Sequence, residues 1–178
     1  MATNSFRTVY AEKIFRLAEE KTDEIYYNSS ADHAIIVHQA LMGNAADYVD
    51  IFSSSMCSEI SNNQEYCRLV DTFLKSDKKH RINIILTDYE DGFTMMPIAK
   101  TLLQYPLQVS IKRYDGRALY KGKPAHFTVS DDRAFRLETD IEQHMAFGNF
   151  NSPRQATELK GLFDKIFNSP LSRTVTPC

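Results

Sequence analysis

Residues 124–150, PAHFTVSDDRAFRLETDIEQHMAFGNF, contain three short stretches in which apolar and aromatic side chains predominate. We expect strands over residues 125–131, 134–139 and 145–150, because each stretch has strand length and is bounded by turn-forming or acidic residues. The first two are separated by the turn Asp131-Asp132. These strands are expected to extend a central sheet in mixed fashion.

The chain before this segment alternates between helical and strand patterns. Apolar periodicity predicts helices over residues 5–22, 34–42 and about 94–104, and a further helix behind the capping sequence Ser61-Asn62-Asn63-Gln64. Strand patterns cover residues 24–28, 48–52, 82–86 and 107–113. Strands that are separated by helices require parallel pairing through right-handed crossovers.

The chain after the segment contains one more helix. Ser152-Pro153-Arg154-Gln155 combines a capping box with proline at the first helical position, and Ala156, Leu159, Phe163 and Ile166 form the inner face. The whole order of elements predicts a three-layer α/β/α sandwich with a mixed, largely parallel central sheet. We expect a single domain over residues 1–168 and a flexible tail over 169–178, which has two prolines and no apolar periodicity.

Composition limits the class of protein. The 178 residues have a hydrophobic fraction of 43% and only 6 Gly and 6 Pro, which excludes disordered and collagen-like chains. The 21 basic and 23 acidic residues nearly balance, so binding of nucleic acid would need a local patch. No apolar stretch is long enough to cross a bilayer and no secretion signal begins the chain, so we expect a cytoplasmic protein without membrane contact. Without C-x-x-C or other metal-ligand spacing, we expect no metal and no cofactor.

Polar residues follow the first two strands that are separated by helices. Ser29 and Ser30 follow one, and Ser53, Ser54 and Ser55 follow the other. Because the ligand crevice of an open α/β sheet lies beyond the carboxyl ends of its parallel strands, these five serines are candidate phosphate-binding residues. Serine in these places is also an ordinary helix cap.

The order of elements and the segment 124–150 resemble the phospholipase D-like superfamily. That superfamily is marked by His-x-Lys, four further residues and Asp on a late strand. In it the histidine attacks phosphorus, the lysine holds the phosphate oxygens, and two copies of the motif build one site. Alternate residues on a strand share a face, so the histidine and lysine both point at the phosphate.

The motif is degenerate in this chain. Pro124 stands at the nucleophile position, His126 stands at the lysine position, and Asp131 matches the acid. If His126 is taken instead as the nucleophile, Thr128 replaces the lysine and Arg133 replaces the acid. Neither proline nor a neutral threonine hydroxyl can do the chemistry of the residue it replaces. The resemblance therefore implies the fold but argues against the activity.

We expect a catalytically inactive phospholipase D-like domain that acts as an interaction or assembly subunit with a protein partner. The family site needs two motif-bearing halves and this chain carries one, so a homodimer is expected, with its seam along residues 125–131. The first alternative is a phosphodiesterase or nuclease in which His126 residues meet across the dimer, oriented by Asp131 or Glu138.

The second alternative is a module that binds nucleic acid through residues 112–123. Tyr114 and Tyr120 alternate there with five basic residues, Lys112, Arg113, Arg117, Lys121 and Lys123. Positive charge attracts phosphate and tyrosine can stack on bases. Basic residues also protect an exposed hairpin or edge strand from aggregation, which is the alternative explanation of this segment.

Overall fold

The computed structural model describes residues 2–56, 58–89, 93–117 and 119–175. The helices are α1 Ala2–Glu19, α2 Ala31–Gly43, α3 Ser58–Ser61, α4 Gln64–Ser76, α5 Pro97–Leu102 and α6 Pro153–Phe167, with a 3-10 turn at Phe93–Met95. The strands are β1 Tyr26–Ser29, β2 Tyr48–Ser53, β3 Arg81–Leu86, β4 Val109–Tyr114, β5 Leu119–Tyr120, β6 Lys123–Pro124, β7 His126–Ser130, β8 Ala134–Asp140, β9 Met145–Asn149 and β10 Ser172–Thr174.

One mixed sheet of eight strands organises the described chain, in the order β1-β9-β8-β7-β2-β3-β4-β10. The neighbours β2, β3 and β4 are parallel, and the other pairs in this sheet are antiparallel. Five of the eight strands, β1, β2, β3, β4 and β8, consequently run in one direction. The strands β5 and β6 form a separate two-stranded hairpin.

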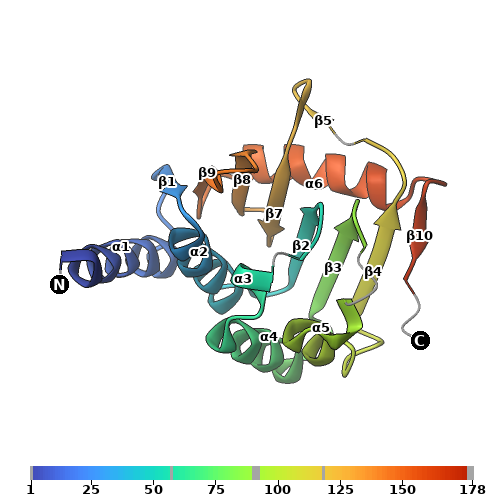
Figure 1. The fold of residues 1–178 in the computed structure, drawn as a ribbon, viewed down its shortest axis with the longest axis horizontal. Helices are drawn as coiled ribbons and strands as arrows, with labels where there is room; N and C mark the ends of the chain where they lie inside the picture. Colours follow the sequence, from blue (N-terminus) through green and yellow to red (C-terminus); the bar gives the residue numbers. More distant parts are fainter. Residues whose placement is uncertain (1, 57, 90–92, 118, 176–178) are drawn as a thin grey trace.

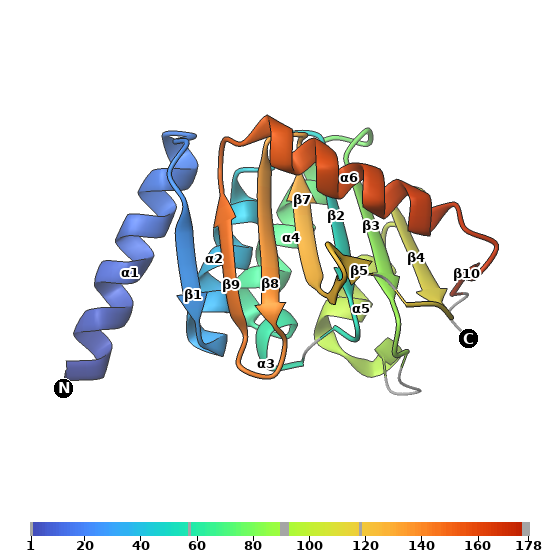
Figure 2. The ribbon, with the colours of Figure 1, turned by 90° about the horizontal axis from the view of Figure 1, so that it is seen from above.

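Helices cover both faces of the sheet, so the molecule is an α/β/α sandwich as expected. Figure 2 shows α6 crossing one face, while α2, α4 and α5 lie behind the other and α1 lies beside the edge strand β1. In Figure 1 the β5 hairpin stands away from the sheet, and α1 and β10 lie on opposite sides of the molecule. The Tyr10 hydroxyl of α1 donates to the Tyr27 carbonyl of β1 at 2.9 Å, which covers part of that edge.

Alternation along the strands builds a core on each face. The four inner-face residues expected in α6 are all buried against apolar side chains from β2, β3, β7 and β8. On the opposite face, residues of α2, α4 and α5 pack on Val49, Ile51, Ile82, Ile84 and Ile111. On β7 and β8, the residues that alternate with the α6-face core include Thr128, Arg136 and Glu138, which are polar and buried. The candidate site is built from these polar residues.

Two local expectations were wrong, and part of the expected tail forms a strand. The strand at 26–29 has no parallel neighbour, because the antiparallel strands β7, β8 and β9 lie between it and β2. Asn63, not Ser61, caps α4, and its side chain accepts a hydrogen bond from the Tyr66 amide. Residues 172–174 of the expected tail form β10 on β4, and residues 176–178 lie outside the described chain.

None of the described helices is both long enough and apolar enough to span a membrane.

Candidate functional site

A cavity of about 340 Å³ lies on the α2 and α4 side of the sheet, where β2 ends and β7 begins. Side chains from α2, α3, α4, β7 and β8 line it together with the loop after β2. Its walls mix apolar residues with polar ones. The polar residues of the lining are His38, Ser53, Ser54, Ser55, Ser61, Thr128, His126, Arg136, Glu138 and His144.

Strand register brings the central polar groups together. Glu138 of β8 pairs with His126 of β7, and Arg136 pairs with Thr128 one step further along the same two strands. All four side chains point to one face because alternate strand residues share a face. Glu138 is only 5% exposed and Arg136 only 3%.

The Glu138 carboxylate is the hub of the cluster. Its Oε1 accepts from Arg136 Nη2 at 2.8 Å and lies 3.4 Å from His144 Nδ1, and its Oε2 lies 3.0 Å from His126 Nδ1. Burial alone would raise the pKa of Glu138, but the hydrogen bond from His126 and the charge of Arg136 outweigh burial and lower this pKa to about 2. Glu138 is therefore ionised at neutral pH.

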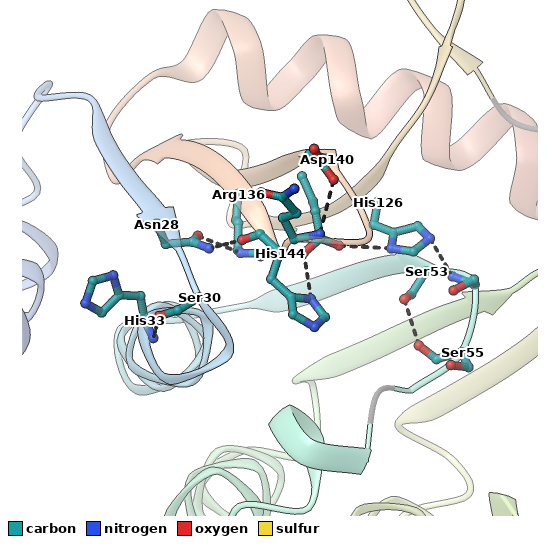
Figure 3. Close-up of polar contacts among 12 residues, drawn as sticks. Asn28, Ser30, His33, Ser53, Ser55, His126, Arg136, Asp140 and His144 are labelled. Atoms are coloured by element: carbon teal, nitrogen blue, oxygen red, sulfur yellow. Dashed lines mark hydrogen bonds and ion pairs between the residues drawn. The ribbon is translucent and has the colours of Figure 1, made fainter. Parts of the chain in front are cut away.

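Both ring nitrogens of His126 have partners. The Ser54 backbone N–H donates to His126 Nε2 at 3.0 Å, so this nitrogen is the acceptor and Nδ1 carries the proton that goes to Glu138. Figure 3 shows the His126 ring beside Ser53 and the loop after β2, with a dashed contact on each side of the ring. The carboxylate and the backbone amide together fix the tautomer and the orientation of this ring.

Arg136 has a second partner that ties the edge strand to the cluster. Its Nε donates to Asn28 Oδ1 at 3.1 Å, and Asn28 Nδ2 donates to the His144 carbonyl at 2.5 Å. The guanidinium charge is thus engaged by one carboxylate and one amide, inside the protein.

Of the three candidate catalytic residues, the structure brings two together. His126 and Glu138 form the pair just described, whereas Asp131 lies at the other end of β7. Its carboxylate accepts the backbone N–H groups of Ala46, Asp47 and Tyr48 at 2.8, 2.8 and 3.1 Å. Asp131 therefore anchors the start of β2 and does not orient His126.

The five candidate phosphate-binding serines fall into two groups. Ser53, Ser54 and Ser55 line the cavity, and the Ser53 hydroxyl donates to the Ser55 carbonyl at 2.7 Å. Ser30 caps α2 by accepting the His33 amide at 3.2 Å, and neither Ser29 nor Ser30 lines the cavity. Figure 3 shows Ser30 and His33 at the start of α2, apart from Ser53 and Ser55. The two groups do not form one rim, because β9, β8 and β7 separate β1 from β2.

The remaining motif positions supply neither a nucleophile nor a lysine at the cavity. Pro124 is exposed in the β5–β6 hairpin, where it pairs with Leu119. Thr128 lines the cavity and is buried. Arg133 donates to the carbonyls of Phe150 and Asn44 near the opposite end of β7. Neither frame of the motif places a lysine or an arginine two residues after a histidine.

The five candidate nucleic-acid-binding residues differ in how strongly their charges are engaged. Lys112 donates to the Phe167 carbonyl at 2.7 Å, Arg113 pairs with Asp115 at 3.0 Å, and Lys121 lies 3.7 Å from Glu158. Arg117 and Lys123 are exposed, and no ion pair of either is found among the described residues.

Arg136, His144 and His38 also belong to the site and were not predicted from the sequence. The signal for Arg136 was present: Arg136 and Glu138 are alternate charged residues inside a strand of otherwise buried character, which predicts an internal pair. His38 and His144 come from α2 and from the β8–β9 connection, so only the folded chain brings them to the cavity. In the described chain, no group of three or more His, Cys, Asp or Glu side chains has an arrangement that could hold a metal ion.

Comparison with solved structures defines the class of fold. The archaeal chromatin protein TrmBL2 superposes with a TM-score of 0.56 at 10% identity, over 94% of this chain and 61% of that one. NucT from Helicobacter pylori gives 0.55 at 12% identity, over 85% of this chain and 100% of its own. The phospholipase D family member Nuc from Salmonella typhimurium gives 0.54 at 10% identity, over 86% and 100%.

The chain has a phospholipase D-like fold, as the resemblance of its element order implied. It spans about three fifths of the archaeal chromatin protein. Comparison of the sequence with protein-family models and with curated proteins gives no match.

Proposed function

We propose that the protein is a non-catalytic phospholipase D-like domain that serves as an assembly subunit. The observation that carries this proposal is the double engagement of His126, whose Nδ1 faces Glu138 at 3.0 Å and whose Nε2 accepts the Ser54 amide at 3.0 Å. A nucleophilic imidazole needs a free lone pair that points at phosphorus. Here the lone pair of Nε2 points at a backbone N–H group.

The one arginine in the described cavity lining is also already paired, although phosphoryl transfer needs a cation that can face the phosphate. Developing charge on phosphate oxygens is stabilised by positioned lysine, arginine or metal. Arg136 is the one lysine or arginine in the cavity lining of the described chain, and Glu138 lies 2.8 Å from it. The positive charge is already neutralised before a substrate arrives.

Phosphodiester turnover tests this part of the proposal. Wild-type protein and His126→Ala, purified identically, are incubated with bis(p-nitrophenyl) phosphate and with single-stranded DNA and RNA. We expect equal, background-level rates for the two proteins. A wild-type rate that His126→Ala abolishes, while a circular dichroism spectrum shows the variant folded, would establish the phosphodiesterase instead.

We further propose that the assembly is a homodimer. The family builds one site from two motif-bearing halves, and a two-fold pair of this chain would reproduce that arrangement. Both edges of β7 are paired, with β2 and β8, and we place the seam at its His126 end, where the cavity lies. Light scattering after size-exclusion chromatography should give twice the 20.4 kDa of the chain. A monomer at all concentrations would contradict the dimer but not the absence of catalysis.

Nucleic-acid binding is the second candidate, and the exposed charges of Arg117 and Lys123 beside the hairpin favour it. The archaeal chromatin protein that shares the fold is described as binding DNA in a novel mode. Double charge reversal, Arg117→Glu with Lys121→Glu, should abolish salt-sensitive binding of DNA or RNA. Lys78→Glu with Lys79→Glu makes the same double change at exposed lysines in the α4–β3 connection and should leave binding intact. Equal loss in that control would show a non-specific charge effect.

A further inference from the structure

The cavity contains its own anion. Arg136, His126 and His144 are the groups that would clamp a phosphate, and all three face the two oxygens of Glu138 at 2.8, 3.0 and 3.4 Å. An incoming phosphate would have to displace this carboxylate or lie beside it. Displacement costs free energy because it leaves the buried Glu138 carboxylate without partners. Binding beside the carboxylate costs free energy because it brings two anions together.

His38 is a polar group of the cavity that the proposed function does not use. Its ring lies against Tyr66 in an edge arrangement with centroids 5.9 Å apart, and no hydrogen bond of the ring is found among the described residues. Burial, together with the nearby charge of Arg136, lowers the pKa of His38 to about 3. A neutral imidazole offers one N–H donor and one acceptor nitrogen.

The other walls are suited to an apolar surface. Met56 and Met96 contribute thioethers, and Ile60, Tyr66 and Ile141 add apolar area. Methionine sulfur and aromatic edges make favourable contacts with aromatic rings. A cavity of about 340 Å³ whose walls combine apolar side chains with convergent polar groups is within the range of small-molecule sites.

We propose that this cavity binds an uncharged aromatic heterocycle with adjacent hydrogen-bond donor and acceptor atoms, the chemistry of a nucleobase, and that Glu138 excludes phosphate from the same place. His38 reads the donor and acceptor edge of the base, and the methionine and tyrosine side chains contact its face. The inference relies on the proposed function only in treating His126 as non-nucleophilic. It concerns binding, so its failure leaves the proposed absence of catalysis standing, and separate binding and turnover assays distinguish the two failures.

Binding to wild-type protein is the first experiment. Adenosine, guanosine, cytidine and uridine are titrated separately by calorimetry, alongside their 5′-monophosphates, inorganic phosphate and a short single-stranded oligonucleotide. We expect at least one nucleoside to bind no more weakly than its monophosphate, and inorganic phosphate not to compete with it. Tighter binding of the oligonucleotide than of the free nucleoside would identify a nucleic-acid chain as the source of the base; the reverse order would identify a free nucleoside.

Two pairs of variants test the roles assigned to the residues. His38→Leu should weaken nucleoside binding at least about tenfold, whereas His38→Gln, which keeps a donor and an acceptor, should bind within about threefold of wild type. Glu138→Gln should gain binding of inorganic phosphate, seen as a phosphate-dependent rise in the thermal midpoint. Glu142→Gln removes an exposed carboxylate of the β8–β9 connection and should show no such gain.

Each part can fail on its own measurement. Absence of binding by all four nucleosides to the wild-type protein, or equal binding by wild type and His38→Leu, overturns the proposed ligand. Tight binding of inorganic phosphate to the wild-type protein overturns the role of Glu138, and this result does not depend on how well Glu138→Gln folds.

Discussion

Asp131 matches the acid of the family motif in sequence, yet the structure predicts that its removal affects folding. The carboxylate accepts three backbone N–H groups from residues 46–48 and lies 3.5 Å from Arg133 Nη2. A hydrogen bond to a charged group contributes about 1.5 to 3 kcal/mol, but two of these three are exposed enough for water to replace the carboxylate. We therefore expect Asp131→Ala to lower the free energy of unfolding by about 3 kcal/mol.

The assay is urea denaturation together with a thermal melt. For a chain of this size, about 3 kcal/mol corresponds to a fall of roughly 6 to 12 °C in the thermal midpoint. Asp131→Asn separates charge from backbone strain, because φ is +54° at this residue and asparagine tolerates the left-handed region as well as aspartate does. The Asp131→Asn variant should lose about half as much free energy of unfolding as Asp131→Ala, because its one carbonyl oxygen still accepts hydrogen bonds.

A matched control is Asp140→Ala. Asp140 accepts one exposed N–H, from Gln143 at 3.1 Å, so its loss should cost no more than about 0.5 kcal/mol. If Asp131→Ala is as stable as this control, the carboxylate does not anchor the start of β2 and the structural assignment of the motif acid is wrong.

Three further predictions concern the core and the buried titratable groups. Gly148→Ala should destabilise by about 3 kcal/mol, because its Cβ would lie 2.3 Å from the Tyr26 hydroxyl and from a β8 carbonyl oxygen; a small change in the urea midpoint would argue against this close contact. Gly161→Ala in α6 meets nothing within 4 Å and should stabilise by about 0.5 to 1 kcal/mol in the same assay; a loss would contradict the open space seen there. Folding lowers the pKa of Glu138 from 4.5 to about 2 and that of His38 from 6.5 to about 3, so on acidification the unfolded chain binds more protons than the folded one. The free energy of unfolding therefore decreases as the pH is lowered. His38 causes this decrease first, and Glu138 adds to it below about pH 4.5. Unfolding measured from pH 7 downward should show His38→Gln removing up to about 1.4 kcal/mol per pH unit of that slope above pH 4.5. An unchanged slope would show that folding does not lower the pKa of His38.

The fold was predictable to the extent that it depends on local patterns. The helical start at Pro153 and the strand alternation in residues 125–150 follow from side-chain periodicity and cap chemistry, and the structure has an element at each place. The order of strands in the sheet depends on long-range packing. Nothing near residues 26–29 indicates that β9, and not β2, is the neighbour of this strand.

Contacts of the site could be predicted from the sequence where the two residues pair across neighbouring strands, and could not be predicted elsewhere. His126 and Glu138 lie on adjacent strands joined by one turn, so their pairing was within reach of the sequence. The Ser54 backbone amide that occupies His126 Nε2 carries no signal in the residue type, because every residue except proline has such a group. Asp131 kept the spacing of the motif acid, but the direction of its side chain depends on a turn with positive φ.

The engagement of His126 can be measured most directly by trapping a phosphoryl-enzyme. Wild-type protein is mixed with bis(p-nitrophenyl) phosphate, quenched rapidly and analysed by intact mass and peptide mass spectrometry, with His126→Ala beside it. With Nε2 held by the Ser54 amide, we expect no phosphoryl adduct on any side chain at any time point. An adduct on His126 that forms and decays with release of product would contradict the account of a non-catalytic domain.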